Sequence, residues 1–319
     1  MSSDIVKRMA VVLPLLICTA CGPAMATSIP PTSVPPSPTV ATALADPTAA
    51  LATPTPEPPL AALVNGQPIY LANYDRKLAQ YEASLLAQGI DPSSPEEQAY
   101  ARERVLNVMI EQVLTEQAAA EAGIAISDAT VEAEMQAMIQ VAGGEDALKA
   151  TLAEWGQTYD DFWQDVRIGL IGMAMTQRIV DAVPTTTEHV HARHIQVDTI
   201  QEAESILARL EAGADFAALA SAHSQDNNTR ASGGDLGFFP RGILVAPELE
   251  EAAFALQPGQ FSQVVSSELG YHIVQVVERD PARPVDPESL RFLQDRAVQE
   301  WVEGLWARAT VQRFVETTP

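Results

Sequence analysis

Two histidines and one aspartate lie in three separate segments of the chain. His194 and His272 each lie in an apolar run that predicts a strand, and Asp226 lies in a polar loop between them. Such residues can meet only in a folded site. Imidazoles fixed on neighbouring strands orient one another and set the protonation and polarity of a carboxylate beside them. The three residue types therefore indicate a preorganised polar site.

A glycine-rich string follows Asp226 and is the most specific local signal in the sequence. It reads Gly-Gly-Asp-Leu-Gly-Phe-Phe over residues 233–239. Its glycines allow a tight turn that ordinary side chains resist. The string lacks the Lys-Ser or Lys-Thr ending of a phosphate-binding loop, so it is not one.

The order and spacing of these strings, from about Val190 to Asp280, resemble the parvulin family of peptidyl-prolyl cis/trans isomerases. The resemblance implies that His194 and His272 are the paired histidines of the site. It places Asp226 where the family has either Cys or Asp. Ser267 falls where the family usually has a hydroxyl group that hydrogen-bonds the second histidine, which implies an orienting role.

The activity implied by the resemblance needs no cofactor. Rotation about a peptide bond faces a barrier of about 18–20 kcal/mol from amide resonance, and X-Pro is the bond at which both isomers are accessible. No bond is made or broken. A desolvated polar site that binds the twisted amide better than the planar forms, next to an apolar proline pocket, is sufficient. We expect no covalent intermediate.

The resemblance also implies which side chains form the proline pocket. They are Leu236, Phe239, Val245, Leu249 and Phe254. At two of these positions, four residues apart, the family has a Met and a Phe. Counting back from Phe254 puts Val245 and Leu249 at those positions. The pocket is expected to be apolar but less filled, with one extra residue in the segment 241–244. This departure bears on catalytic strength more than on binding.

The substrate is expected to be unphosphorylated. Phospho-specific parvulins carry a basic cluster in the loop after the first strand. Here Val197 and Asp198 lead almost directly into a helix, with Thr199 and Glu202 as a capping box. A phosphate would find no cluster of cations there.

The sequence offers three alternatives to an isomerase: a metal site, a protease and a non-enzymatic holdase. His189 and His191 next to His194 suggest a metal site, but strand alternation puts His194 on the opposite face, so we expect no metal and a solvated His189 and His191. A protease is not supported, because the sequence contains neither a serine nucleophile motif nor an HExxH helix. A non-enzymatic holdase stays open as an alternative: the altered pocket favours it, and retention of the His, Asp and His residues favours an isomerase.

The remaining sequence predicts an α+β chain with a helical module around the isomerase. An Asn65-Gly66 hairpin is followed by helices, of which the best marked begins at Pro95 after the N-cap Ser94. This block resembles the N-terminal chaperone domain of the SurA and PrsA foldases. We expect the chaperone domain at 60–187, a parvulin domain with an FKBP-like antiparallel sheet at 188–280, and a C-terminal helix in 281–319 that returns to complete the chaperone domain.

The N-terminus reads as a lipoprotein signal peptide over residues 1–21. An apolar run after Lys7 and Arg8 ends in Cys-Thr-Ala-Cys, which resembles a lipobox with Cys21 as the lipidated residue, although Cys18 replaces the usual Leu. Plain secretion and an uncleaved anchor are the alternatives. Residues 22–59, rich in Pro, Thr and Ala, predict a disordered tether. The protein is expected outside the cytoplasm, anchored to a membrane.

Charge limits the possible partners. The formal net charge is −23, which argues against nucleic acid because phosphate backbones bind basic surfaces. Both cysteines lie in the leader, so the mature chain has no disulfide and no thiol nucleophile. The expected partners are unfolded or partly folded exported polypeptides.

Overall fold

The computed structural model describes residues 58–316, and the chain divides into two compact units. Among the described residues, the first contains 58–172 and 308–316, and the second contains Met173–Ala307. The predicted signal peptide, with Cys21, lies outside the described residues, as does all but the end of the predicted tether. Within residues 58–316, no helix is both long and apolar enough to cross a membrane.

The first unit contains a small antiparallel sheet in the order β2-β1-β7. Strand β1 (Leu60–Val64) turns into β2 (Gln67–Tyr70) through Asn65 and Gly66, whose positive φ values of 50° and 85° suit a tight hairpin. On the other side β1 pairs with β7 (Val311–Arg313). Asn65 fastens this junction, because its N–H donates to the Thr310 oxygen at 2.9 Å and its Oδ1 accepts from the Thr310 N–H at 2.8 Å.

Helices make up the rest of the first unit. They are α2 (Leu71–Ala87), α3 (Pro95–Glu121), α4 (Asp128–Ala142), α5 (Glu145–Glu154) and α6 (Tyr159–Ala182), the last of which continues into the second unit. Ser94 caps α3 as predicted, accepting the Glu97 N–H at 3.2 Å. A core of buried side chains joins α4, α5 and α6, formed by Val131, Met135, Ile139, Leu148, Leu152, Phe162 and Val166.

The second unit contains a four-stranded antiparallel sheet in the order β4-β3-β6-β5. Its strands are β3 (Thr186–Val197), β4 (Asp235–Pro240), β5 (Val265–Ser267) and β6 (Gly270–Pro284). The helices between and after them are α7 (Ile200–Glu211), α8 (Phe216–His223), the short 3-10 helix η1 (Arg230–Ser232), α9 (Pro247–Ala255) and α10 (Pro287–Arg308). The chain is therefore of the α+β class.

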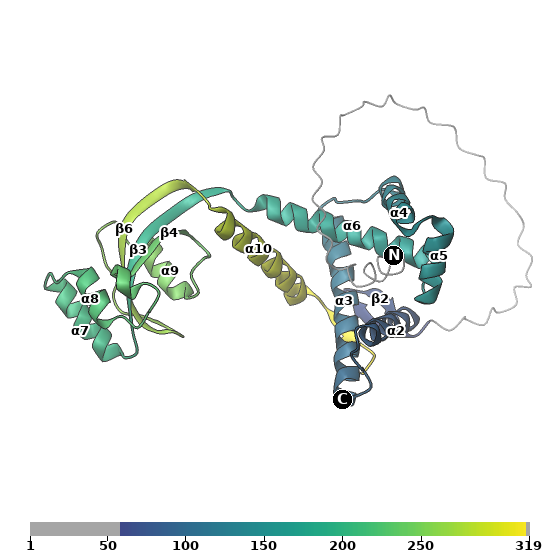
Figure 1. Ribbon diagram of the computed structural model, residues 1–319, viewed down its shortest axis with the longest axis horizontal. Helices are drawn as coiled ribbons and strands as arrows, with labels where there is room; N and C mark the ends of the chain where they lie inside the picture. Colours follow the sequence, from purple (N-terminus) through teal and green to yellow (C-terminus); the bar gives the residue numbers. More distant parts are fainter. Residues whose placement is uncertain (1–57, 317–319) are drawn as a thin grey trace, which may run out of the picture. The chain divides into compact units, whose positions relative to one another are not determined.

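Strand alternation gives this sheet two apolar faces. Ile195, Val197 and Ile273 pack with side chains of α7 and α8 on one face. Val190, Ala192 and Val274 pack with side chains of α9 on the other. Figure 1 shows α7 and α8 on one side of the sheet and α9 on the other. His194 and His272 share the face of α9, because they are separated by even numbers of residues from Ala192 and Val274 along regular strand.

The C-terminal segment joins both units. Helix α10 begins after Asp286, whose Oδ1 accepts the N–H groups of Glu288 and Ser289, each at 3.0 Å. The contact pattern assigns α10 almost entirely to the second unit, whereas β7 joins the sheet of the first. The predicted return of the chain to the helical unit is thus made by a strand.

Candidate functional site

His194 and His272 lie on adjacent strands and face the same side of the sheet. The register places His194 opposite Val274 and Gln196 opposite His272, so the two histidines are diagonal neighbours. Their rings are stacked, with centroids 5.7 Å apart and an angle of 9° between planes. His194 is 5% exposed and His272 is 1% exposed. The β3–β6 pairing thus brings the two histidines together in a buried place.

Asp226 lies in the loop after α8 and reaches His194. Its Oδ2 atom is 2.8 Å from His194 Nε2 and accepts a 2.5 Å hydrogen bond from the Thr229 hydroxyl. Its Oδ1 atom accepts the Asn228 N–H at 3.0 Å. Burial raises the pKa of Asp226, but the hydrogen bonds from Thr229, His194 and Asn228 outweigh burial and leave that pKa below its ordinary value. Asp226 is therefore a carboxylate at neutral pH.

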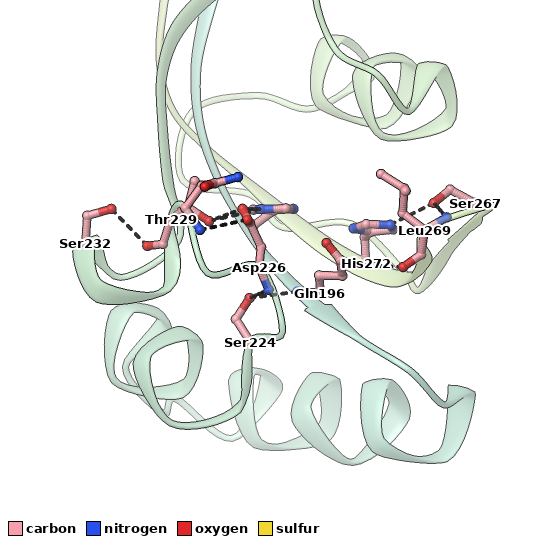
Figure 2. Close-up of polar contacts among 10 residues, drawn as sticks. Gln196, Ser224, Asp226, Thr229, Ser232, Ser267, Leu269 and His272 are labelled. Carbon is pink, nitrogen blue, oxygen red and sulfur yellow. Dashed lines mark hydrogen bonds and ion pairs between the residues drawn. The ribbon is translucent and has the colours of Figure 1, made fainter.

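The loop that carries Asp226 is bonded to β3. The buried Ser224 hydroxyl accepts the N–H groups of Gln196 at 3.2 Å and Asp226 at 3.3 Å. The Gln225 N–H donates to the Gln196 oxygen at 2.7 Å. Figure 2 shows Asp226 and Thr229 on one side of Gln196, and His272 with Ser267 on the other. Asp226 is held in place by backbone as well as by side chains.

The glycine-rich turn lies directly against the backbone of His194. The His194 N–H donates to the Gly234 oxygen at 2.8 Å. A Cβ atom on Gly234 would lie 2.1 Å from the His194 carbonyl oxygen, and its φ of +84° also disfavours any other residue. Gly234 is required because η1 and β4 approach β3 too closely for a side chain.

Ser267 and burial determine the state of His272. Ser267 Oγ accepts the Leu269 N–H at 3.0 Å and lies 2.8 Å from His272 Nε2, so a hydrogen bond joins the hydroxyl to the imidazole and orients the ring. Burial, and then the neighbouring His194, lower the pKa of His272 from 6.5 to about 4. His272 is therefore neutral at pH 7. The Nδ1 atoms of both histidines are buried and have no hydrogen-bond partner among residues 58–316.

An apolar cluster lies on the same face of the sheet. Phe239 and Phe254 meet edge to face with centroids 6.0 Å apart, Leu249 is buried beside them, and Leu236 packs against the cluster. Val245 is 87% exposed and lies outside the cluster. Ile243 and Leu244, which precede it, pack there instead. Four of the five predicted pocket residues are brought together, and the extra residue of the loop leaves Val245 at the surface.

The flanking histidines of β3 do not behave as predicted from a regular strand. His189 is 2% exposed, and its Nδ1 lies 3.0 Å from the Thr187 oxygen, so the prediction that it is solvated is wrong. The register of β3 and β6 shifts between Thr187 and His189, where β6 contains one residue more than β3. His191 is partly exposed and pairs with Asp235 at 2.7 Å. The part of the chain covered by the structure holds no group of three or more His, Cys, Asp or Glu side chains that could bind a metal ion.

Sequence reasoning missed Thr229 and Ser224. Thr229 is 9% exposed and lies 3.1 Å from His194 Nε2 as well as 2.5 Å from Asp226. Its position three residues after an Asp is typical of a turn in which short polar side chains bond locally, and this signal was available. Ser224 has no comparable signal, because its partner Gln196 is distant in the sequence.

The arrangement suits electrostatic work on a neutral group. A fixed carboxylate and a neutral imidazole lie beside apolar side chains, in surroundings that exclude much of the water. The Thr229 hydroxyl donates to a carboxylate that also binds His194, and the Ser267 hydroxyl forms a hydrogen bond with the buried His272. Preorganised dipoles of this kind stabilise a change in charge distribution within a bound amide.

Comparisons with known proteins match two separate segments of the chain to two families. Residues 185–278 match the family model of the PPIC-type PPIase domain, and residues 51–150 match that of the SurA-like N-terminal domain. The chain is 31% identical over 273 residues to the foldase protein PrsA of Caldanaerobacter subterraneus subsp. tengcongensis, covering 80% of this chain and 87% of that protein. It is 34% identical over 229 residues to PrsA of Halalkalibacterium halodurans, covering 66% of this chain and 68% of the other.

Solved structures are also similar. The crystal structure of the peptidylprolyl isomerase PrsA from Bacillus anthracis is 28% identical to the chain, and the match covers 61% of this chain and 96% of that one, with a TM-score of 0.38.

Proposed function

Because the chain belongs to the PrsA family of foldases, and is a peptidyl-prolyl cis/trans isomerase and folding chaperone for exported proteins, we propose that His194, Asp226, His272 and Ser267 form its catalytic site. The observation that carries this proposal is the bonded group of Asp226, His194 and Thr229 on the same face as the apolar cluster. We assign Leu236, Phe239, Leu249 and Phe254 to the proline pocket.

Catalysis in this proposal proceeds without a covalent intermediate. The proline ring is held by the apolar cluster, and the carboxylate of Asp226 repels the carbonyl oxygen of the planar amide more than that of the twisted amide. The neutral His272, oriented by Ser267, supplies a polar wall that needs no reorganisation during rotation. Each 1.36 kcal/mol of preference for the twisted amide gives a tenfold gain in rate.

The proposed substrate is an unphosphorylated X-Pro segment. Thr199 caps α7 by accepting the Glu202 N–H at 3.3 Å, so β3 passes into the helix without a longer loop. Asp198 and Glu202 bring negative charge to this connection. A phosphate group before the proline would meet repulsion there instead of a cationic partner.

We further propose a two-module chain anchored outside the cytoplasm. The chaperone domain is assigned to 60–187 and the isomerase to 188–280. Within 281–319, the pairing of β7 with β1 supports assigning the end of the segment to the chaperone module, whereas α10 lies in the second unit. Lipidation of Cys21 and a tether over residues 22–59 would hold both at a membrane. Replacing Cys21 by Ala is expected to release the protein from the membrane fraction.

The proposed site is tested by measuring isomerisation of an Ala-Pro peptide with the full mature chain. His272→Ala and Asp226→Ala are expected to lower kcat/KM at least tenfold. His223→Ala is the matched control, because His223 lies at the end of α8 near Glu202 and outside the site. Equal activity of His272→Ala and the wild type would overturn the assignment. Suppression of client aggregation by an inactive His272→Ala chain would identify holdase activity independent of isomerisation.

A further inference from the structure

A single carboxylate binds three backbone N–H groups of the loop between β4 and α9. This loop, residues 241–246, contributes Ile243 and Leu244 to the apolar cluster but has no regular secondary structure. Glu250 on α9 accepts three consecutive backbone N–H groups: Gly242 on Oε1 at 2.7 Å, and Ile243 and Leu244 on Oε2 at 3.0 and 3.2 Å. Both carboxylate oxygens are therefore used to fix the backbone of the pocket loop.

The carbonyl side of the same loop is held from α10. Arg296 Nη1 donates to the Gly242 oxygen at 2.9 Å, and Arg296 Nε donates to Glu300 Oε1 at 2.7 Å, which orients the guanidinium group. A Cβ on Gly242 would lie 2.9 Å from Leu293 Cδ2 on the same helix, and Gly242 has a φ of +91°. The loop and α10 are thus in direct contact at Gly242.

These contacts bear on substrate binding because the loop carries part of the pocket wall. Leu244 occupies the inward place that was predicted for Val245, and its backbone N–H is one of the three bound by Glu250. Hydrogen bonds to a charged acceptor are stronger than bonds between neutral groups. Without them the loop would have to be ordered by the substrate, and binding would be weakened by that entropy.

We propose that Glu250 and Arg296 are positioning residues that preorganise the loop 242–244 and thereby set the affinity of the isomerase for proline. Helix α10 is then a working part of the isomerase, although it lies beyond the segment 185–278 that matches the PPIase family model. The inference rests on the proposed function, because it takes the apolar cluster to be the proline pocket.

The test uses the full mature chain with Glu250→Gln and Arg296→Met. The controls are Glu251→Gln, which changes the neighbouring exposed carboxylate on α9, and Arg291→Met, which changes an exposed arginine on α10. Hydrogen exchange of the loop amides is expected to accelerate about tenfold in Glu250→Gln. KM for an Ala-Pro peptide is expected to rise about five- to tenfold, with kcat changed less than about twofold. Arg296→Met is expected to change loop exchange and KM in the same direction, with each logarithmic change about half as large.

The possible outcomes separate this inference from the proposed function. Unchanged loop exchange and unchanged KM in both variants, in an active protein, would overturn the positioning role, as would a fall in kcat at constant KM. If the wild type fails to isomerise the peptide, the proposed function fails, and loop exchange still decides whether Glu250 and Arg296 hold the loop. If Glu250→Gln also accelerates exchange of the buried Ile195 and Ile273 amides, it has destabilised the whole sheet. Loop exchange and KM of Arg296→Met, a change at an exposed residue, then decide the result.

Discussion

Acid should destabilise the second unit through His272 in a pH range where an ordinary histidine would be harmless. Burial and the neighbouring His194 lower its pKa from 6.5 to about 4 in the folded chain. Between these two pH values the unfolded chain binds a proton that the folded chain does not. The free energy of unfolding therefore falls as the pH falls through this window, and the contribution of neutral His272 is fully present only above pH 6.5.

The size of the effect follows from the shift. A difference of about 2.5 pKa units, at 1.36 kcal/mol each, corresponds to about 3 kcal/mol over the whole window. Between pH 7 and pH 5 the same linkage predicts a loss of about 2 kcal/mol, because only part of the window is crossed. This is a large share of the 5–15 kcal/mol that is typical of a folded domain.

Native-state hydrogen exchange of the Ile195 and Ile273 amides measures this loss in the strands that carry the two histidines. The wild type is compared with His272→Asn at pH 5 and pH 7, with intrinsic exchange rates corrected for pH. The variant has a lower baseline from lost packing, but its pH dependence should be smaller by about 2 kcal/mol. Equal pH dependence in the two proteins would refute the argument that His272 is buried in its neutral form.

Substitutions at four further positions test the site and the fold. Thr229→Val removes the 2.5 Å bond to Asp226 and is expected to raise the pKa of that carboxyl and lower kcat/KM about fivefold. Thr229→Ser should restore both values. Activity measured against pH checks this prediction, and wild-type values in the Val variant would contradict it. Gly234→Ala, with its 2.1 Å clash, should destabilise the second unit by at least about 3 kcal/mol in denaturant unfolding. Gly237→Ala, which meets nothing within 4 Å, should cost only about 1 kcal/mol, and equal costs would exclude the clash as the cause. Ser94→Ala should cost about 1 kcal/mol in the first unit by thermal unfolding, and no change would show that this cap is dispensable.

The sequence predicts best where the determining interactions are local. The N-cap and proline at the start of α3, and the Asn65-Gly66 turn between β1 and β2, depend on residues within a few positions of one another. The spacing of apolar residues likewise predicts the helices of the first unit, including the one that begins at Pro95. The pairing of β3 with β6 was predicted through family resemblance, since no local signal specifies it.

Errors arose where distant contacts override local pattern. His189 was expected in solvent, but it is 2% exposed and its ring bonds the Thr187 oxygen, a contact that strand alternation does not reveal. Val245 was reached by counting back from Phe254, and the count passes through the loop with the extra residue. In the structure Glu250 binds the backbone N–H of Leu244 in this loop, and the Leu244 side chain packs against the apolar cluster. Counting along a sequence cannot locate an extra residue when the path of the loop depends on contacts with distant side chains.

The pairing of β1 with β7 sets an order of events for the newly made chain. β1 begins at residue 60 and β7 ends at residue 313, so one edge of β1 stays open while the intervening isomerase is synthesised and emerges. Domains that precede others usually fold first, but here the sheet of the earlier unit is completed by a strand that follows the later unit in the sequence. An open strand edge is a site where other chains can pair. During its own export, this foldase therefore passes through a stage with the same hazard that it relieves in its clients.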